Sequence, residues 1–252
     1  MSGHSKWSQI KRQKGVADAR RGQVFTRLAR EIIVAVRQGG SNPEANFRLR
    51  LAVQRARDSN MPLDNIERAI KRGSGETGGA SLAEITFEGY GPNGVAILVE
   101  AVTDNRNRTL QDVRNIFSRG GGSLGDSGCV AWIFDSKGVI TVESREGGME
   151  ELALDAIDAG AEDVKTGSGY VEIYTNPQEL ETVRKALEQK DVAIASVELS
   201  MVPKTVVGME EKEALQTLRL LDRLEELDEV QRLFSNADFS DSVMEKYKSQ
   251  MI

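Results

Sequence analysis

The sequence predicts an α+β protein of several domains: an N-terminal three-helix domain followed by two ferredoxin-like α/β domains, one inserted in the other. The 252 residues are enough for two or three compact domains. Apolar residues follow a helical period up to about residue 75 and mixed strand and helix periods after residue 79. The charge also changes sign there. Residues 1–75 carry 16 basic and 6 acidic side chains, a net charge of +10, whereas residues 76–252 carry 17 and 33, a net charge of −16.

Residues 1–78 are predicted to form the helical domain, with helices over residues 17–38, 43–58 and 62–73. In the first of these, apolar residues are spaced by one and three positions, which is typical of a helix that buries one face. Asn42 and Pro43 predict the start of the second helix, because asparagine caps a helix and proline fits its first turn. In the third helix, Leu63 is expected to face the core.

The glycine-rich residues 73–79 predict a flexible linker and the first domain boundary. Beyond it, the β-branched segments 85–90 and 95–102 are separated by a Gly-Pro-Asn-Gly turn, a pattern typical of a β-hairpin. A helix over residues 106–119 and a strand over residues 129–134 are expected to follow.

Residues 137–204 are predicted to form a β-α-β-β-α-β unit, which is the ferredoxin-like arrangement. Its second helix is expected to begin at Asn176, which is followed by proline. The flanking segments 79–136 and 205–240 supply the strands and helices of another sheet. The unit 137–204 is therefore predicted to be inserted into that discontinuous domain, and residues 241–252 are predicted to form a polar tail.

The composition argues against an enzyme and against a metal site. The chain has one histidine, His4, and one cysteine, Cys129, so it cannot assemble a His/Cys zinc site or an internal disulfide. A Ser-His-Asp triad would require His4, which lies in the basic N-terminal arm. Magnesium-dependent hydrolysis by carboxylates is the remaining enzymatic alternative, but no acidic residues are spaced like a known site. We therefore predict no enzymatic activity, no catalytic residue, no cofactor and no bound metal.

Nothing in the sequence predicts contact with a membrane. No segment approaches the ~20 apolar residues that span a bilayer, and the basic N-terminus is not followed by the apolar run of a secretory signal. A single cysteine fits a reducing compartment. A cytoplasmic protein is expected, and the oligomeric state stays open.

The excess of basic residues in the first 75 positions predicts binding to a polyanion. Unpaired positive charges repel one another unless a polyanion neutralises them, and the phosphates of DNA or RNA are the expected partner. The predicted nucleic-acid-binding residues are Lys6, Trp7, Lys11, Arg12, Lys14, Arg20, Arg21, Arg27, Arg30, Arg48, Arg55, Lys71 and Arg72. Trp7 either stacks on a base or packs on the neighbouring domain. Arg106, Arg108 and Arg114 either form a secondary contact or pair with nearby acids.

The residues do not decide between DNA and RNA. The predicted second and third helices are joined by a short loop, but the third carries few asparagine or glutamine side chains that could read bases. Structured RNA, such as ribosomal RNA, therefore suits the basic arm as well as duplex DNA does. A scaffold protein is a further alternative, in which the acidic helix over residues 210–226 binds a basic partner.

Several motifs resemble those of the YebC family. They are Gly3-His-Ser-Lys-Trp7, Ile10-Lys-Arg-Gln-Lys14, Phe25-Thr-Arg-Leu-Ala-Arg-Glu-Ile32, Asn46-Phe-Arg-Leu-Arg50, Asn60-Met-Pro62, Ile66-Glu-Arg-Ala-Ile-Lys71, Glu88-Gly-Tyr-Gly-Pro92, Thr103-Asp-Asn-Arg-Asn-Arg-Thr109 and Ser235-Asn-Ala-Asp238. The resemblance extends nearly end to end. It implies a three-domain fold, with a helical N-terminal domain and two α/β domains, one inserted in the other.

The resemblance also implies a cytoplasmic protein commonly described as a probable transcriptional regulator that binds DNA. Other members of the family, including the mitochondrial translational activator of cytochrome oxidase, act on translation through the ribosome. The leading expectation is thus a DNA-binding transcriptional regulator. The alternative is a translation factor that binds RNA or the ribosome through the same basic domain.

Overall fold

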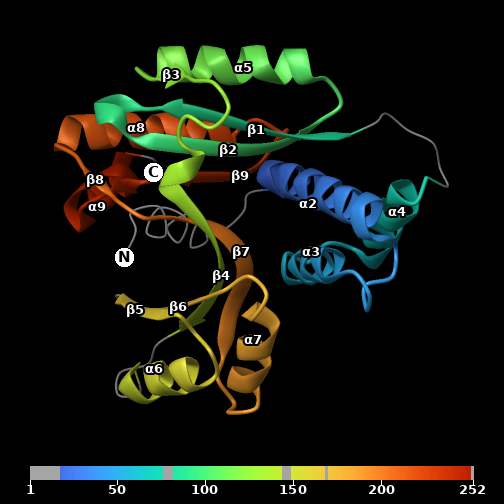
Figure 1. Cartoon of the computed structure of the whole chain (residues 1–252). Helices are drawn as coiled ribbons and strands as arrows, with labels where there is room; N and C mark the ends of the chain where they lie inside the picture. Colours follow the sequence, from blue (N-terminus) through green and yellow to red (C-terminus); the bar gives the residue numbers. More distant parts are fainter. Residues whose placement is uncertain (1–17, 76–81, 144–148, 168–169, 251–252) are drawn as a thin grey trace.

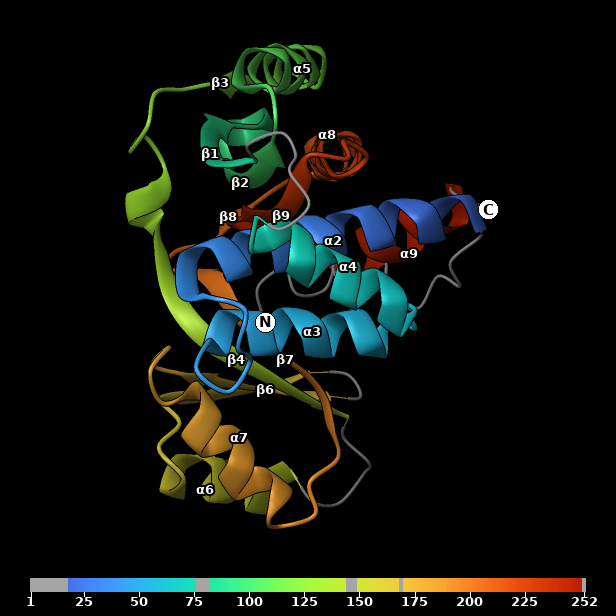
Figure 2. The same cartoon turned by 90° about the vertical axis from the view of Figure 1, so that its right-hand side faces the viewer.

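The computed structural model describes residues 18–75, 82–143, 149–167 and 170–250, except for the side chains of residues 18–21 and 250. Figure 1 shows two α/β layers, one above the other, and three N-terminal helices beside them. These helices are α2 (Asp18–Gly39), α3 (Phe47–Asp58) and α4 (Leu63–Gly73). In Figure 2 they lie in front of the junction between the two layers.

The three N-terminal helices pack around a small apolar core of their own. Ile32 of α2, Leu49 of α3 and Ile66 of α4 are buried in it. The helical spacing of apolar residues therefore identified the correct face of each helix. Leu63 is the exception, because it lies in the first turn of α4 and is 58% exposed, so the prediction that it faces the core is wrong.

Helix α3 begins later than predicted because Asn46, not Asn42, is its N-cap. The side-chain oxygen of Asn46 accepts a hydrogen bond from the backbone N–H of Leu49 at 3.0 Å. Its amide group donates to the carbonyl oxygens of Ala35 and Gly40, both at 2.8 Å, so the cap also joins α3 to the end of α2. This second set of bonds is what makes Asn46 the better cap.

The first sheet combines strands from the two segments that flank the inserted unit. Its order is β3 (Ser123–Leu124), β1 (Ala83–Tyr90), β2 (Ala96–Thr103) and β9 (Val230–Ser235), and all neighbours are antiparallel. β1 and β2 form the predicted hairpin through the short 3-10 helix η1 (Pro92–Gly94). The spatial order is ferredoxin-like, but β1 occupies the place of the third strand and precedes the other strands in the chain.

Helices α5 (Arg106–Arg119) and α8 (Glu211–Glu225) cover one face of this sheet. Phe117 of α5 and Leu218 of α8 are fully buried there. The expected polar tail is instead a helix, α9 (Asp241–Gln250), that packs on α8. Val243, Met244 and Tyr247 of α9 are buried in the same core, so the prediction of a polar tail is wrong. These apolar residues are spaced by one and three positions, the signal of a one-sided helix.

Two short strands, β8 (Val207–Gly208) and β10 (Ala237–Asp238), form a separate parallel pair.

The inserted layer has the predicted ferredoxin-like order. Its strands lie in the order β5 (Asp163–Gly167), β6 (Tyr170–Thr175), β4 (Phe134–Glu143) and β7 (Ile194–Pro203), all antiparallel. Helices α6 (Met149–Asp158) and α7 (Leu180–Glu188) belong to this layer. β4 and β7 pair from Phe134↔Pro203 onwards and connect the two layers.

Two predictions are wrong here: the start of a helix and the presence of a strand. Helix α7 begins at Leu180, because the side chain of Asn176 accepts a hydrogen bond from Gln178 in a turn. The predicted strand over residues 129–134 is replaced by a loop and the 3-10 helix η2 (Ala131–Ile133). The backbone N–H groups of that loop bond to a glutamate side chain, Glu88, and not to a neighbouring strand.

Candidate nucleic-acid interface and the junction of the domains

The predicted nucleic-acid-binding residues fall into three groups in the structure. Lys6, Trp7, Lys11, Arg12 and Lys14 lie outside the described residues, and so do the side chains of Arg20 and Arg21 in α2. Arg27, Arg30, Arg48 and Arg55 lie at the junction between the helical domain and the two α/β layers. Lys71 and Arg72 are exposed on α4.

Arg27 and Arg30 of α2 bind the C-terminal end of α8. Arg27 donates to the carbonyl oxygens of Glu225 and Leu227, the latter at 3.3 Å. Arg30 donates to the carbonyl oxygen of Asp228 at 2.6 Å. The last carbonyl groups of a helix have no partner within the helix and carry the negative end of its dipole. Arg27 therefore caps α8 from another domain through Glu225, while Leu227 and Asp228, the partners of Arg27 and Arg30, lie in the turn that follows the helix. Burial lowers the pKa of Arg27.

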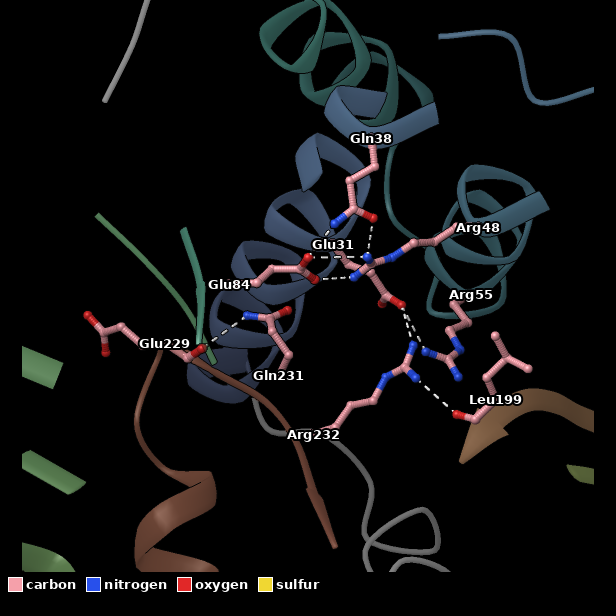
Figure 3. A network of polar contacts seen from close by, with 9 residues as sticks. All are labelled: Glu31, Gln38, Arg48, Arg55, Glu84, Leu199, Glu229, Gln231 and Arg232. Atoms are coloured by element: carbon pink, nitrogen blue, oxygen red, sulfur yellow. Dashed lines mark hydrogen bonds and ion pairs between the residues drawn. The ribbon is translucent and has the colours of Figure 1, made fainter. Parts of the chain in front are cut away.

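Arg48 of α3 connects the helical domain to the first sheet. Figure 3 shows its guanidinium between the side chains of Gln38 and Glu84, the latter on β1. The contact to Glu84 is bidentate, because Nη1 and Nη2 each reach one carboxylate oxygen. Bidentate pairs of this kind fix orientation as well as distance.

Glu31 of α2 lies at the centre of the junction. Its Oε1 atom accepts hydrogen bonds from Arg55 at 3.0 Å and from Arg232 of β9 at 2.8 Å (Figure 3). Arg55 also reaches Glu198 of β7 at 3.1 Å, and Arg232 donates to the carbonyl oxygen of Leu199 at 2.9 Å. One cluster thus joins the helical domain to both α/β layers.

The acidic and basic side chains of this cluster stabilise each other in their charged forms. Burial alone would raise the pKa of Glu31, but Arg55 and Arg232 outweigh it and hold the pKa below its usual range. Burial lowers the pKa of Arg232, but Glu31 and Glu100 outweigh that effect, so the guanidinium stays charged. Both ions of the Glu31–Arg232 pair are therefore stabilised by the junction.

A cavity of about 410 Å³ adjoins the cluster. The charged residues that line it are Glu31, Arg48, Glu84, Glu100 and Arg232. Glu100 differs from the others, because its pKa is raised by burial despite the attraction of Arg232 and Arg48. The surroundings thus disfavour the charged form of Glu100, whereas they favour that of Glu31.

The junction changes the interpretation of four predicted contact residues. Arg27, Arg30, Arg48 and Arg55 all use their guanidinium groups within the chain, so a phosphate would compete with these intramolecular contacts. Their binding to nucleic acid stays a prediction. Glu31 was missed, although it lies on the same side of α2 as the buried apolar residues, which is where a carboxylate needs a buried partner.

Helix α4 carries three exposed basic residues within five positions. Arg68, Lys71 and Arg72 are all exposed, and the described part of the chain offers them no ion pair. Arg68 and Arg72 also line a shallow groove of about 250 Å³ between α2 and α4, together with Asn65 and Phe25. These side chains are available to a polyanion.

The predicted secondary contact residues Arg106, Arg108 and Arg114 differ in whether they are paired. Arg108 forms ion pairs with Asp104 at 3.0 Å and with Glu229 at 2.9 Å, and its hydrogen bond to Glu229 raises its pKa. Arg106 and Arg114 are exposed on α5, and no described residue pairs with either. The alternative of pairing with nearby acids therefore holds for Arg108.

Over the described ranges, no three histidine, cysteine or carboxylate side chains are grouped so that they could hold a metal ion. No helix in those ranges has the length and apolarity of a membrane span.

Both parts of the chain match known families of domains. Residues 5–76 match the family model described as the TACO1/YebC protein N-terminal domain, and residues 82–237 match the one described as the TACO1/YebC second and third domain. A probable transcriptional regulatory protein of Dehalococcoides mccartyi strain BAV1 is 60% identical over 250 residues, covering 99% of this chain and 100% of the relative. Another, of Natranaerobius thermophilus, is 50% identical over 248 residues, covering 97% and 99%.

A solved structure agrees with these matches. The crystal structure of a conserved hypothetical protein from Aquifex aeolicus is 48% identical, with a TM-score of 0.85, and the match covers 94% of this chain and 98% of that one. The chain belongs to the TACO1/YebC family.

Proposed function

We propose that this protein is a non-enzymatic regulator of gene expression that binds nucleic acid through its basic N-terminal domain. The observation that carries the proposal is the segregation of charge, +10 over residues 1–75 against −16 over the rest. The printed names of the relatives, probable transcriptional regulatory proteins, support the regulatory role. The protein acts in the cytoplasm without a cofactor.

The proposed contact surface consists of the N-terminal arm and the exposed face of α4. The arm contributes Lys6, Lys11, Arg12 and Lys14, and α4 contributes Arg68, Lys71 and Arg72. The junction arginines orient the domain and leave fewer cations for phosphates than the sequence predicts. The acidic body is repelled by the same phosphates, so the molecule binds with its N-terminal domain towards the nucleic acid.

Duplex DNA is the proposed target, and RNA is the second candidate. The names of the relatives favour DNA. One observation favours RNA: α4 exposes arginine and lysine side chains, whereas its asparagine, Asn65, is only partly exposed. A helix that reads bases in a major groove needs base-reading side chains on its exposed face.

The test is fluorescence anisotropy with a labelled duplex DNA and a labelled RNA hairpin of equal length, across a range of salt concentrations. In the triple variant Arg68→Ala, Lys71→Ala, Arg72→Ala, the slope of log affinity against log salt should fall by about one for each lost phosphate contact. The matched control is Lys212→Ala, Arg219→Ala, Arg223→Ala, which removes the same charge from exposed positions of α8 for which no phosphate contact is predicted. Equal effects of the two triple variants, or none, would overturn the proposed surface.

A further inference from the structure

One loop of the first α/β domain holds an exposed tryptophan in a fixed position. The chain has two tryptophans, and Trp132 in η2 is 67% exposed. It is followed directly by β4, the strand that leads into the inserted layer. An exposed aromatic side chain of this size loses contact with water when a partner covers it, so its exposure needs a reason.

A buried carboxylate accepts hydrogen bonds from the backbone of this loop. Glu88 of β1 is 4% exposed and accepts three backbone hydrogen bonds: from Gly128 at 2.7 Å, Val130 at 2.9 Å and Ala131 at 2.8 Å. Burial alone would raise the pKa of Glu88, but the three N–H groups outweigh it and lower the pKa. The loop is therefore fixed by charge-assisted bonds immediately before Trp132.

The polar edge of the indole is already used within the loop. Its Nε1–H donates to the carbonyl oxygen of Cys129 at 3.0 Å, and the hydroxyl of Tyr90 donates to the same oxygen at 2.9 Å. Gly128 adopts a φ of +87°, which glycine accepts without strain. What Trp132 offers to a partner is its ring face, in a single orientation.

The charge beside the ring is compatible with a phosphate. The ammonium group of Lys204 donates to the carbonyl oxygen of Trp132 at 3.0 Å and lies 3.1 Å from Asp135. An ammonium group has three N–H donors, so one remains for an incoming anion. The three backbone donors stabilise the negative charge of Glu88 but do not remove it.

We infer that Trp132 is a stacking platform for an unpaired nucleobase, with Lys204 contacting the adjacent phosphate. The inference rests on the proposed binding of nucleic acid and adds to it one contact on the α/β body, for an unpaired base. It therefore favours RNA, the second candidate, over duplex DNA as the target. In a duplex, the faces of the bases are covered by their neighbours, whereas an unpaired base can stack on an aromatic ring. A ring that is fixed before binding loses little conformational entropy when a base covers it.

The test uses the fluorescence of Trp132 in the full chain with Trp7→Phe, in which it is the only tryptophan. Three probes are compared at equal length: a uridine oligoribonucleotide, a thymidine oligodeoxynucleotide and a duplex DNA. We expect saturable quenching by the single-stranded probes and weak quenching by the duplex. The two single-stranded arms distinguish RNA from single-stranded DNA as the source of the base.

Affinity is measured in parallel by the anisotropy of labelled probes. Trp132→Ala should weaken binding of the single-stranded probes about 5- to 150-fold, the effect of losing one stacked base. Leu154→Ala is the matched control, because Leu154 is equally exposed, at 67%, in the inserted domain. Lys204→Ala should reduce the salt slope for the single strand by about 0.7.

The outcomes separate the inference from the proposed function. If the probes bind but Trp132 fluorescence and the Trp132→Ala affinity do not change, the stacking inference is overturned and nucleic-acid binding stands. That result would assign the exposed ring to a protein partner. If the wild-type chain binds none of the three probes, the proposed function fails as well.

Discussion

The carboxylate of Glu31 lies 2.8 Å from the guanidinium of Arg232, although the two residues are 201 positions apart in the sequence. The same carboxylate oxygen lies 3.0 Å from Arg55. Through Glu198 and Leu199, the cluster also reaches the inserted layer. The orientation of the N-terminal domain thus depends on ion pairs, which respond to pH and to the loss of a single charge.

Glu31→Gln should destabilise the protein. It leaves Arg55 and Arg232 side by side, and removing one partner of a buried ion pair costs about 3–5 kcal/mol. The Glu31 side chain is 13% exposed, so we expect a loss near the lower end of that range. Urea unfolding measures it. The control Glu67→Gln changes an exposed residue of α4 and should alter the free energy of unfolding by less than about 0.5 kcal/mol. Equal losses in both variants would contradict the role of the cluster.

The effect of Glu31→Gln should also depend on pH. The pKa of Glu31 is lowered in the folded protein, so its contribution to stability is present above the unfolded pKa, about 4.3, and is lost as the pH falls through the folded value. The difference in unfolding free energy between wild type and variant should be full at neutral pH and shrink below about pH 4.3. A difference that stays constant down to about pH 2 would show that the ionised carboxylate is not responsible.

Glu100→Gln should change the free energy of unfolding in the opposite direction, towards higher stability. Burial raises the pKa of Glu100, so the folded protein binds a proton more tightly than the unfolded chain does. Its ionisation therefore destabilises the folded state, and that cost grows as the pH rises from the unfolded pKa to above the folded one. We expect Glu100→Gln to be more stable than wild type at neutral pH, and the gain to disappear below about pH 4.3. Urea unfolding at several pH values checks this, and a gain that persists in acid would contradict it.

Glu88→Gln should loosen the loop that carries Trp132. A glutamine amide can accept hydrogen bonds only through its oxygen, so its NH₂ group would face a backbone N–H of the loop. An unsatisfied buried donor costs about 1–3 kcal/mol. In the Trp7→Phe background, time-resolved fluorescence anisotropy should show more local motion of Trp132. Unchanged motion together with unchanged stability would argue against Glu88 as the anchor.

The sequence predicts correctly those elements whose signal lies within the element itself. The hairpin of β1 and β2 has β-branched strands and a glycine-proline turn, and the two strands pair from Ala83↔Thr103 to Tyr90↔Ala96 in the structure. The predicted start of α3 is too early because Asn42 and Pro43 form a typical N-terminal capping sequence. The actual cap, Asn46, is decided by contacts to Ala35 and Gly40 that form only when α2 and α3 pack.

The candidate site was less predictable, because a basic side chain looks the same in sequence whether it binds a phosphate or a carboxylate. Arg27 binds Glu225, 198 positions away, and one of the two carboxylate partners of Arg55, Glu198, is 143 positions away. Only the tertiary fold decides that these charges are used internally. The predicted strand over residues 129–134 is a loop and a 3-10 helix in the structure, although its apolar residues Val130 and Ile133 are buried as strand residues would be.

Arg48 and Arg72 provide a direct test of the division between junction and surface. The sequence predicts a phosphate contact for both, and replacing either by alanine removes one positive charge from the same domain. Arg48 is bound to Glu84 and Gln38, whereas Arg72 is exposed and has no ion pair among the described residues.

Arg72→Ala should therefore reduce the salt slope of nucleic-acid binding by about one and leave the unfolding free energy within about 0.5 kcal/mol of wild type. Arg48→Ala should leave the salt slope unchanged and destabilise the protein by about 1 kcal/mol, since its pair with Glu84 is partly exposed. Anisotropy titrations and urea unfolding of the two variants give both quantities. If Arg48→Ala also lowers the slope, phosphates reach the guanidinium at the junction, and nucleic-acid binding must then compete with the docking of the N-terminal domain.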